Sequence, residues 1–238
     1  MIMKILTFTL LIFFNSFALT DSLKTAIESE IRSDKNVARD VYRHPYETLT
    51  FFGIRPDMTV IELSPGGGWY TEILAHYLKD NGELIAVHFD PSMGDFAKRV
   101  RDNFEKKLAS SSVYDQVKLA SLNSKYSEVE SVDVVVTFRN LHNWIGPNWD
   151  FIIKNSYASL KKGGLLGVVE HRAKEGTSIE NMKKTGYVTE KYAIESIEKL
   201  GFKLIAKSEI NSNPKDTKDH PRGCLLYTSD AADDDPRV

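Results

Sequence analysis

A cluster of small residues follows an acidic side chain near the start of the chain, in the order Glu62, Ser64, Gly66, Gly67 and Gly68. Residues 59–63 are apolar and partly β-branched apart from Glu62, which predicts an interior parallel strand. Apolar residues then recur at helical spacing from Trp69 onward. A strand, a glycine loop and a helix let a ligand approach bare backbone at a helix N-terminus. The segment predicts a site for a nucleotide-like ligand, and the alternative is an ordinary tight turn.

A second polar segment follows the apolar residues 132–138. His142 is the candidate general base, because the unperturbed pKa of histidine lies near neutrality. Asn140 is the candidate for orienting a cofactor or substrate. The alternatives are a hydrogen-bonded loop histidine and a turn asparagine.

Asp90 lies roughly 20 residues beyond the glycines, where a carboxylate commonly holds the hydroxyls of a ribose. Its alternative role is to form a turn before Pro91. His88 and His142 have too few acidic companions to predict a metal site.

The elements that position these residues alternate between strands and helices, which predicts an α/β fold with a mostly parallel sheet and helices on both faces. In such sheets the loops at the carboxyl ends of the strands line one crevice. Strands are expected at 59–63, 83–89, 117–119, 132–138, 165–170 and 202–209, and helices at 69–78, 95–108, 149–160 and 190–200, the last capped by Thr189.

The spacing Glu62-x-Ser64-x-Gly66-x-Gly68 resembles the E/D-x-G-x-G-x-G motif of class I S-adenosylmethionine-dependent methyltransferases, with serine in place of the first glycine. A nicotinamide oxidoreductase fingerprint would need a glycine at Thr71. Residues 138–141 and 160–166 resemble segments of quinone-biosynthesis methyltransferases. Residues 39–223 resemble a group of predicted bacterial exported methyltransferases.

This resemblance implies a Rossmann-like sheet and S-adenosylmethionine as the cofactor. Many of these methyltransferases place the ribose-binding acid at the position of His88, which leaves Asp90 as the acid expected here. The expected catalytic residues are His142 and Asn140. The expected cofactor-binding residues are Glu62, Ser64, Gly66, Gly67, Gly68, Asp90 and Asn140.

The two ends of the chain differ from the domain of residues 19–223. Residues 1–18 have the apolar run and small residues of a signal peptide cleaved after Ala18, which predicts export to the periplasm without stable membrane insertion. Residues 224–238 are expected to be a non-native tail, since Cys224 to Asp234 resembles a translated sequencing adapter. The domain is then truncated at its C-terminus, and strand 7 of the methyltransferase sheet is expected to be missing.

The composition of the 238 residues is that of a globular protein, with a net charge of −2 and no basic run, so nucleic acid is not favoured as a partner. The predicted function is methyl transfer from S-adenosylmethionine to a small molecule. The alternative is a non-catalytic, exported binding protein that retains the methyltransferase fold.

Overall fold

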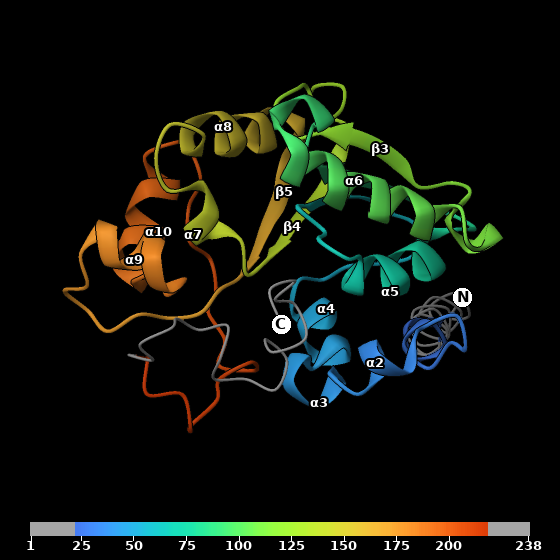
Figure 1. The fold of residues 1–238 in the computed structure, drawn as a ribbon, viewed down its shortest axis with the longest axis horizontal. Coiled ribbons are helices and arrows are strands. Elements are labelled where there is room, and N and C mark those ends of the chain that lie inside the picture. The colour runs from blue at the N-terminus through green and yellow to red at the C-terminus, as the bar shows by residue number, and fades with distance from the viewer. Residues whose placement is uncertain (1–21, 219–238) are drawn as a thin grey trace, which may run out of the picture.

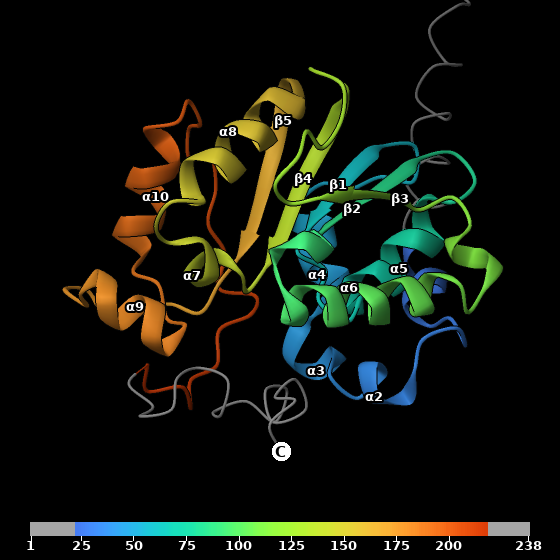
Figure 2. The same ribbon diagram turned by 45° about the horizontal axis from the view of Figure 1, so that its top comes forward.

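The computed structural model describes residues 22–218, so the predictions for residues 1–18 and 224–238 lie outside the described part of the chain. Five parallel strands form one sheet in the order β3-β2-β1-β4-β5, which confirms the predicted α/β class (Figures 1 and 2). The strands are β1 (Thr59–Leu63), β2 (Glu83–His88), β3 (Lys118–Ser121), β4 (Val132–Phe138) and β5 (Leu160–Val169).

Helices cover both faces of the sheet (Figure 2). Residues 22–27 are helical, and the later α-helices are α2 (Asp34–Val37), α3 (Asp40–Arg43), α4 (Pro45–Phe51), α5 (Trp69–Leu78), α6 (Asp95–Leu108), α7 (Leu141–Trp144), α8 (Trp149–Ser159), α9 (Ile179–Thr185) and α10 (Glu190–Glu198). Two short 3-10 helices, η1 (Pro91–Met93) and η2 (Ser112–Tyr114), precede α6 and β3.

Alternation along the strands divides the core into two layers. Val60, Leu84 and Val136 face α5 and α4, whereas Ile61, Val87 and Val135 face α7 and α8. Strands that are apolar on both faces are typical of an interior parallel sheet. This packing holds the carboxyl ends of β1, β2 and β4 side by side, at the point where the order of the strands reverses.

β5 starts earlier than predicted, because α8 ends at Ser159 and the strand begins at Leu160. Its register against β4 jumps from Val132–Leu160 to Val134–Leu165, so residues 161–164 form an irregularity within the strand. Gly163 there has φ +79°, a conformation that side chains rarely adopt. Gly163 and Gly164 lie within this irregularity.

The predicted strand at residues 202–209 is wrong, since this segment forms no β-ladder in the described chain. Phe202 packs edge-on against Tyr157 of α8, and the Leu204 N–H donates to Glu198 of α10 at 3.1 Å. A strand needs a neighbour to pair its backbone groups, and β5 pairs only with β4 among the described residues.

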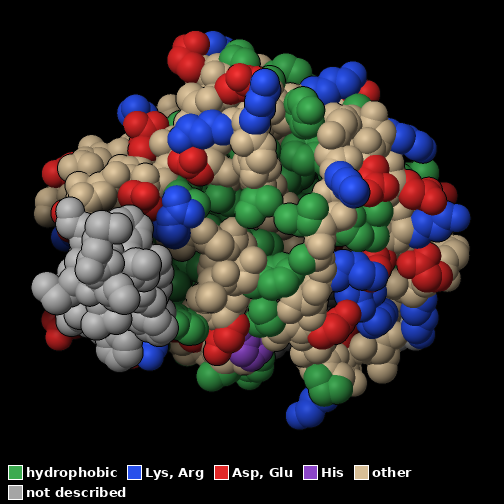
Figure 3. Space-filling model, turned by 180° about the vertical axis from the view of Figure 1, so that it is seen from behind, with side chains coloured by type: hydrophobic (Ala, Val, Ile, Leu, Met, Phe, Trp, Pro, Cys, Tyr) green, Lys and Arg blue, Asp and Glu red, His purple; other side chains and the backbone are tan. Residues whose placement is uncertain are grey.

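Apolar side chains remain accessible on this side of the chain: Leu204 is 44% exposed and Ile205 is 74% exposed. A view from behind also shows hydrophobic side chains gathered in the middle of that face of the molecule (Figure 3). In the described part of the chain, no helix is long and apolar enough to span a bilayer.

Candidate functional site

The glycine loop connects the carboxyl end of β1 to α5. Its backbone has the left-handed conformations that allow another group to approach the main chain closely. Ser64, Gly66 and Gly68 all have positive φ, at 52°, 58° and 80°. A Cβ added to Gly66 or Gly67 would meet nothing within 4 Å, so the backbone of this loop faces open space. A Cβ at Gly68 would instead lie 3.0 Å from Phe104 and Lys107 of α6. Gly66 and Gly67 therefore have open space beside their backbone, and Gly68 is packed against α6.

Two neighbours hold the loop at Ser64. The Ser64 N–H donates to the Val87 carbonyl of β2 at 2.8 Å, and the Ser64 carbonyl accepts from Asn140 Nδ2 at 3.2 Å. The Ser64 hydroxyl is buried and has no hydrogen-bond partner. Because an unpaired buried hydroxyl costs free energy, this orphaned group indicates a place where a bound ligand completes the structure.

Glu62 lies directly beneath the loop and is buried, with 2% of its surface exposed. Its Oε2 accepts a hydrogen bond from the Thr71 hydroxyl of α5 at 2.6 Å. Burial raises the pKa of Glu62 to about 7, although the Thr71 hydrogen bond and the charges of Lys107 and Arg43 act in the opposite direction. Glu62 therefore links the end of β1 to the first turn of α5 through Thr71.

His88, at the end of β2, is committed to the loop. Its Nδ1 accepts the Phe89 N–H at 2.8 Å, so Nε2 carries the proton and donates to the Gly66 carbonyl at 3.2 Å. Burial lowers the pKa of His88, and its ring stacks on Phe104 at 4.9 Å. The neutral imidazole fixes the glycine loop from below.

Asp90 lies two residues further on, half-buried at the carboxyl edge of the sheet. Its Oδ1 accepts the Ser92 N–H at 2.8 Å, which is the turn-forming role considered from the sequence. Hydrogen bonds from Ser92, and then from Ser121 and Asn123, lower the pKa of Asp90. Asp90 is thus an ionised carboxylate among hydroxyl and amide groups at the ends of β2 and β3.

Asn140 ties the ends of β1 and β4 together. Besides Ser64, its Nδ2 donates to the Phe138 carbonyl at 3.0 Å and lies 3.3 Å from the Thr137 hydroxyl. Its amide nitrogen is therefore occupied by the protein, and its carbonyl oxygen is the group through which it would contact a ligand.

His142, on the first turn of α7, faces a carboxylate after the end of β5. Its Nδ1 lies 3.3 Å from Glu170 Oε2, and its backbone N–H donates to the same oxygen at 3.4 Å. The other oxygen of Glu170 accepts the His171 N–H at 2.9 Å. A carboxylate on Nδ1 leaves Nε2 as the basic nitrogen, an arrangement that suits general-base catalysis.

Two arginines lie close to this pair. Arg139 has φ +63° and donates its N–H to the Val169 carbonyl of β5 at 2.7 Å. Burial lowers the pKa of His171 to about 3, and the positive charges of Arg139 and Arg43 act in the same direction. Arg139 and Arg43 thus lie close enough to His171 for their charges to act on its imidazole.

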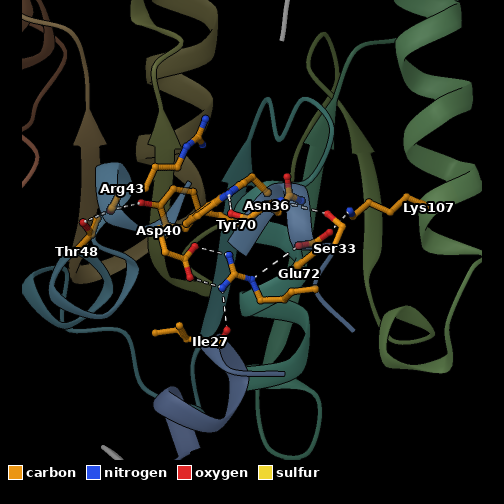
Figure 4. A network of polar contacts seen from close by, with 11 residues as sticks. Ile27, Ser33, Asn36, Asp40, Arg43, Thr48, Tyr70, Glu72 and Lys107 are labelled. Carbon is orange, nitrogen blue, oxygen red and sulfur yellow. Dashed lines mark hydrogen bonds and ion pairs between the residues drawn. The ribbon is translucent and has the colours of Figure 1, made fainter. Parts of the chain in front are cut away.

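The N-terminal helices are fixed over the site by a buried polar network (Figure 4). Arg32 is fully buried and binds both oxygens of Asp40, at 2.7 and 2.6 Å, and the Ile27 carbonyl at 2.8 Å. Glu72 of α5 lies 3.8 Å from Arg32 and 2.5 Å from Lys107 of α6. This chain of contacts joins α3 to α5 and α6.

Arg43, at the end of α3, is positioned through its backbone. Its carbonyl accepts from the hydroxyls of Thr48 at 3.1 Å and Tyr70 at 3.2 Å. The guanidinium lies 4.8 Å from the centre of the Trp69 ring, and Figure 4 shows the side chain pointing away from the Arg32 network. Arg43 is 9% exposed.

Residues 211–216 cross from the N-terminal helices to the β5 side of the site. Asn211 Nδ2 donates to the Thr48 hydroxyl at 3.0 Å, and its Oδ1 lies 3.4 Å from His44 Nδ1. The Tyr187 hydroxyl donates to Asp216 at 2.9 Å. This C-terminal segment therefore contacts both sides of the site.

A separate hollow of about 710 Å³ runs along β3 and residues 124–131, beside Glu83 and Thr59 at the amino ends of β2 and β1. It includes neither the glycine loop nor His142. Among residues 22–218, no group of three or more His, Cys, Asp or Glu could hold a metal ion.

The sequence placed the glycine loop, Asp90, Asn140 and His142 at one edge of the sheet, and the structure has them there. It gave no role to Glu170, His171 or Arg139, and it considered Thr71 only as the residue that stands where a nicotinamide fingerprint has glycine. The available signal for Glu170 was its position as the last residue of the predicted strand 165–170, at the edge of the sheet where the site lies.

A parallel sheet in the order 3-2-1-4-5, with a glycine loop after the switch strand, defines the fold of class I S-adenosylmethionine-dependent methyltransferases. Residues 61–168 match the family model described as a methyltransferase domain. The chain therefore contains a methyltransferase domain of this class, which implies S-adenosylmethionine as its cofactor.

Solved structures share this fold at low sequence identity. A SAM-dependent methyltransferase from Aquifex aeolicus has a TM-score of 0.57 and 15% identity, covering 79% of this chain and 90% of that one. The [4+2]-cyclase SpnF has the same TM-score and identity, covering 81% and 72%. A methyltransferase from Bacillus halodurans C-125 has a TM-score of 0.50 and 17% identity, covering 67% and 69%. No curated protein matches the chain.

Proposed function

We propose that the chain is an exported enzyme that transfers a methyl group from S-adenosylmethionine to a small molecule. The observation that carries the proposal is the glycine loop, in which the backbone of Gly66 and Gly67 is open and the buried Ser64 hydroxyl lacks a partner. Such a loop fits a cofactor that lies against bare backbone at the end of β1.

In this proposal Gly66, Gly67 and the Ser64 hydroxyl hold the methionine part of the cofactor, and Asp90 accepts hydrogen bonds from the ribose. Glu62 and His88 act beneath the loop and keep its shape. The Asn140 oxygen faces the ligand while its nitrogen ties β1 to β4. When bound, the cofactor supplies an activated methyl group on a sulfonium.

The protein then has to position the acceptor and take its proton. His142 Nε2 accepts that proton, and Glu170 holds Nδ1 so that Nε2 is the free basic nitrogen. Glu170 is a positioning residue in this scheme. Export separates the enzyme from the cytosol, where the cofactor is made, so a periplasmic enzyme would need its own supply.

Calorimetric titration with S-adenosylmethionine tests the proposal. Gly67→Val should abolish binding with an unchanged far-UV circular dichroism spectrum, because Gly67 has open space beside it and no positive φ. Chromatography of the mixture should then detect S-adenosylhomocysteine once an acceptor is supplied. Absence of binding to the unmutated protein would refute the proposal, and binding without turnover across an acceptor panel would favour the non-catalytic alternative. The turnover measurement is necessary because SpnF, which has a similar fold, is a [4+2]-cyclase, so the fold by itself does not establish methyl transfer.

A further inference from the structure

We infer that Ser64 determines which part of the cofactor the site recognises: its hydroxyl bonds to the amino-acid end of S-adenosylmethionine, and the fold without cofactor is less stable because of this side chain. The inference rests on the proposed function, since it deepens the role of the same loop. It starts from a serine that the fold holds in a conformation suited to glycine.

Two features of Ser64 are unfavourable in the fold. Its φ of 52° lies in the left-handed region, where a side chain costs free energy relative to glycine. Its hydroxyl is buried and has no hydrogen-bond partner among residues 22–218, which adds a cost of desolvation. A glycine at position 64 would remove both costs. The stability of the fold therefore gives no reason for a serine at this position.

The backbone of Ser64 is fixed, whereas its side chain can turn. The N–H donates to the Val87 carbonyl at 2.8 Å, and the carbonyl accepts from Asn140 Nδ2 at 3.2 Å. A serine side chain has three staggered positions about its Cα–Cβ bond, and Ser64 as a residue is only partly buried. The hydroxyl can thus turn toward a ligand that lies on the open backbone of Gly66 and Gly67. Because a hydroxyl both donates and accepts, it matches either charged group of an amino acid.

The order of the strands indicates which part of the cofactor passes Ser64. Asp90, the proposed ribose ligand, follows β2 and lies within hydrogen-bonding reach of Ser121 at the end of β3. Asn140, which bonds to Ser64, follows β4 on the opposite side of β1. A cofactor whose ribose lies at Asp90 therefore extends its amino-acid end past Ser64 toward the end of β4.

Calorimetric titration of the full chain with two ligands tests this assignment. S-adenosylhomocysteine contains the amino-acid part, and methylthioadenosine is the same thionucleoside without it. Ser64→Ala removes the hydroxyl and keeps a Cβ at the same φ. This variant should bind S-adenosylhomocysteine roughly tenfold more weakly than the unmutated protein, the factor expected for one lost hydrogen bond to a charged group. It should bind methylthioadenosine with unchanged affinity.

Thermal unfolding without ligand measures the cost of the side chain. Ser64→Gly should raise the melting temperature by about 2–4 °C, because it removes the strain and the unpaired hydroxyl together. Glu130→Gly is the matched control. Glu130 also has a positive φ, at 55°, but it is exposed and donates its N–H to the Ala158 carbonyl at 3.0 Å, before the amino end of β4. Its replacement should leave the affinity for S-adenosylhomocysteine unchanged.

Several outcomes would overturn the inference. One is unchanged binding of S-adenosylhomocysteine by Ser64→Ala, and another is an equal loss of affinity for methylthioadenosine. A lower melting temperature of Ser64→Gly without ligand would give the serine a structural role, and an equal loss of affinity in Glu130→Gly would show that the effect is not specific to the loop. Each of these results leaves the proposed function standing. If the unmutated protein does not bind S-adenosylhomocysteine, the proposed function fails, and the inference fails with it.

Discussion

Replacing Glu62 with glutamine should change how the stability of the protein depends on pH. The buried carboxyl group has a pKa of about 7 in the folded chain, against 4.5 for an unperturbed glutamate. The folded state therefore holds its proton more tightly than the unfolded state does. The stability that this group contributes is complete below pH 4.5 and is lost as the pH rises toward 7. Over this range the unfolded chain releases the proton, whereas the folded chain must either retain it or bury a charged carboxylate.

The magnitude follows from the two pKa values. A shift from 4.5 to about 7 corresponds to roughly 3 kcal/mol in total, and linkage places roughly 2.5 kcal/mol of it between pH 5 and pH 8. Glutamine can still accept the Thr71 hydrogen bond, but it does not titrate. Relative to Glu62→Gln, the unmutated protein should thus lose about 2.5 kcal/mol of stability over this range.

Urea unfolding followed by tryptophan fluorescence measures this quantity for both proteins at pH 5, 6, 7 and 8. The difference between the two curves is the relevant readout, since burial also lowers the pKa of His88 and His171, whose contributions rise with pH and cancel in the difference. The charges of Lys107 and Arg43 oppose the shift and are present in both proteins. Parallel stability profiles would refute the reasoning, because they would mean that Glu62 is already ionised in the fold at pH 5.

Four further outcomes are expected. Gly68→Val should lower the melting temperature by several degrees, because position 68 has a positive φ and the new side chain would clash with Phe104 and Lys107. Gly67→Val should leave the melting temperature unchanged, since nothing lies within 4 Å of a Cβ there. Equal melting temperatures of the two variants would contradict the assignment of the two glycines. Arg32→Met should cost about 3–5 kcal/mol of unfolding free energy, because it removes the buried partner of Asp40 and leaves Glu72 with its Lys107 ion pair. Lys98→Met, which breaks an exposed pair with Asp102, should cost less than about 1 kcal/mol. Similar losses in urea titrations would show that the Arg32 network is not critical. Asp90→Asn should weaken binding of S-adenosylhomocysteine and of adenosine several-fold in calorimetry but leave methionine unaffected, and unchanged adenosine binding would remove Asp90 from the ribose site. Residues 1–18 should export a reporter enzyme that is active only in the periplasm, with mature protein starting at Leu19 by mass spectrometry; intact protein in the cytosol would argue against a signal peptide.

Elements whose limits depend on local sequence could be predicted from the sequence. β1, β4, α5 and α6 have the bounds that their apolar spacing indicates, and Thr189 caps α10 by accepting the Tyr192 N–H. The limits of β5 could not be read in this way, because residues 161–164 form an irregularity that exists only relative to β4. Residues 202–209 have the composition of a strand, but no neighbouring strand is available to pair with them in the described chain.

In the site, too, features set by local sequence could be predicted, whereas contacts between distant segments could not. The glycine loop is continuous in sequence, so its position and its exposed backbone could be predicted. The His142–Glu170 contact joins residues 28 positions apart, and it arises only because β4 and β5 pair and end together. Arg43 comes from α3 and is placed by contacts of that helix with Tyr70 and Trp69, whereas Arg139 directly follows β4 and bonds to the Val169 carbonyl of β5.

The two departures from the methyltransferase motif are linked by the geometry of the loop. Serine at position 64 adopts a left-handed conformation that costs roughly 1–2 kcal/mol relative to glycine. Its N–H and carbonyl are both bonded to neighbouring strands or loops, and these bonds hold the strained residue in place. Histidine at position 88 donates to the Gly66 carbonyl in the same loop, which an ionised acid at that position could not do. Since His88 is engaged with the loop, the proposed function gives the ribose-binding role to a carboxylate beyond the end of β2, and Asp90 is the residue at that place.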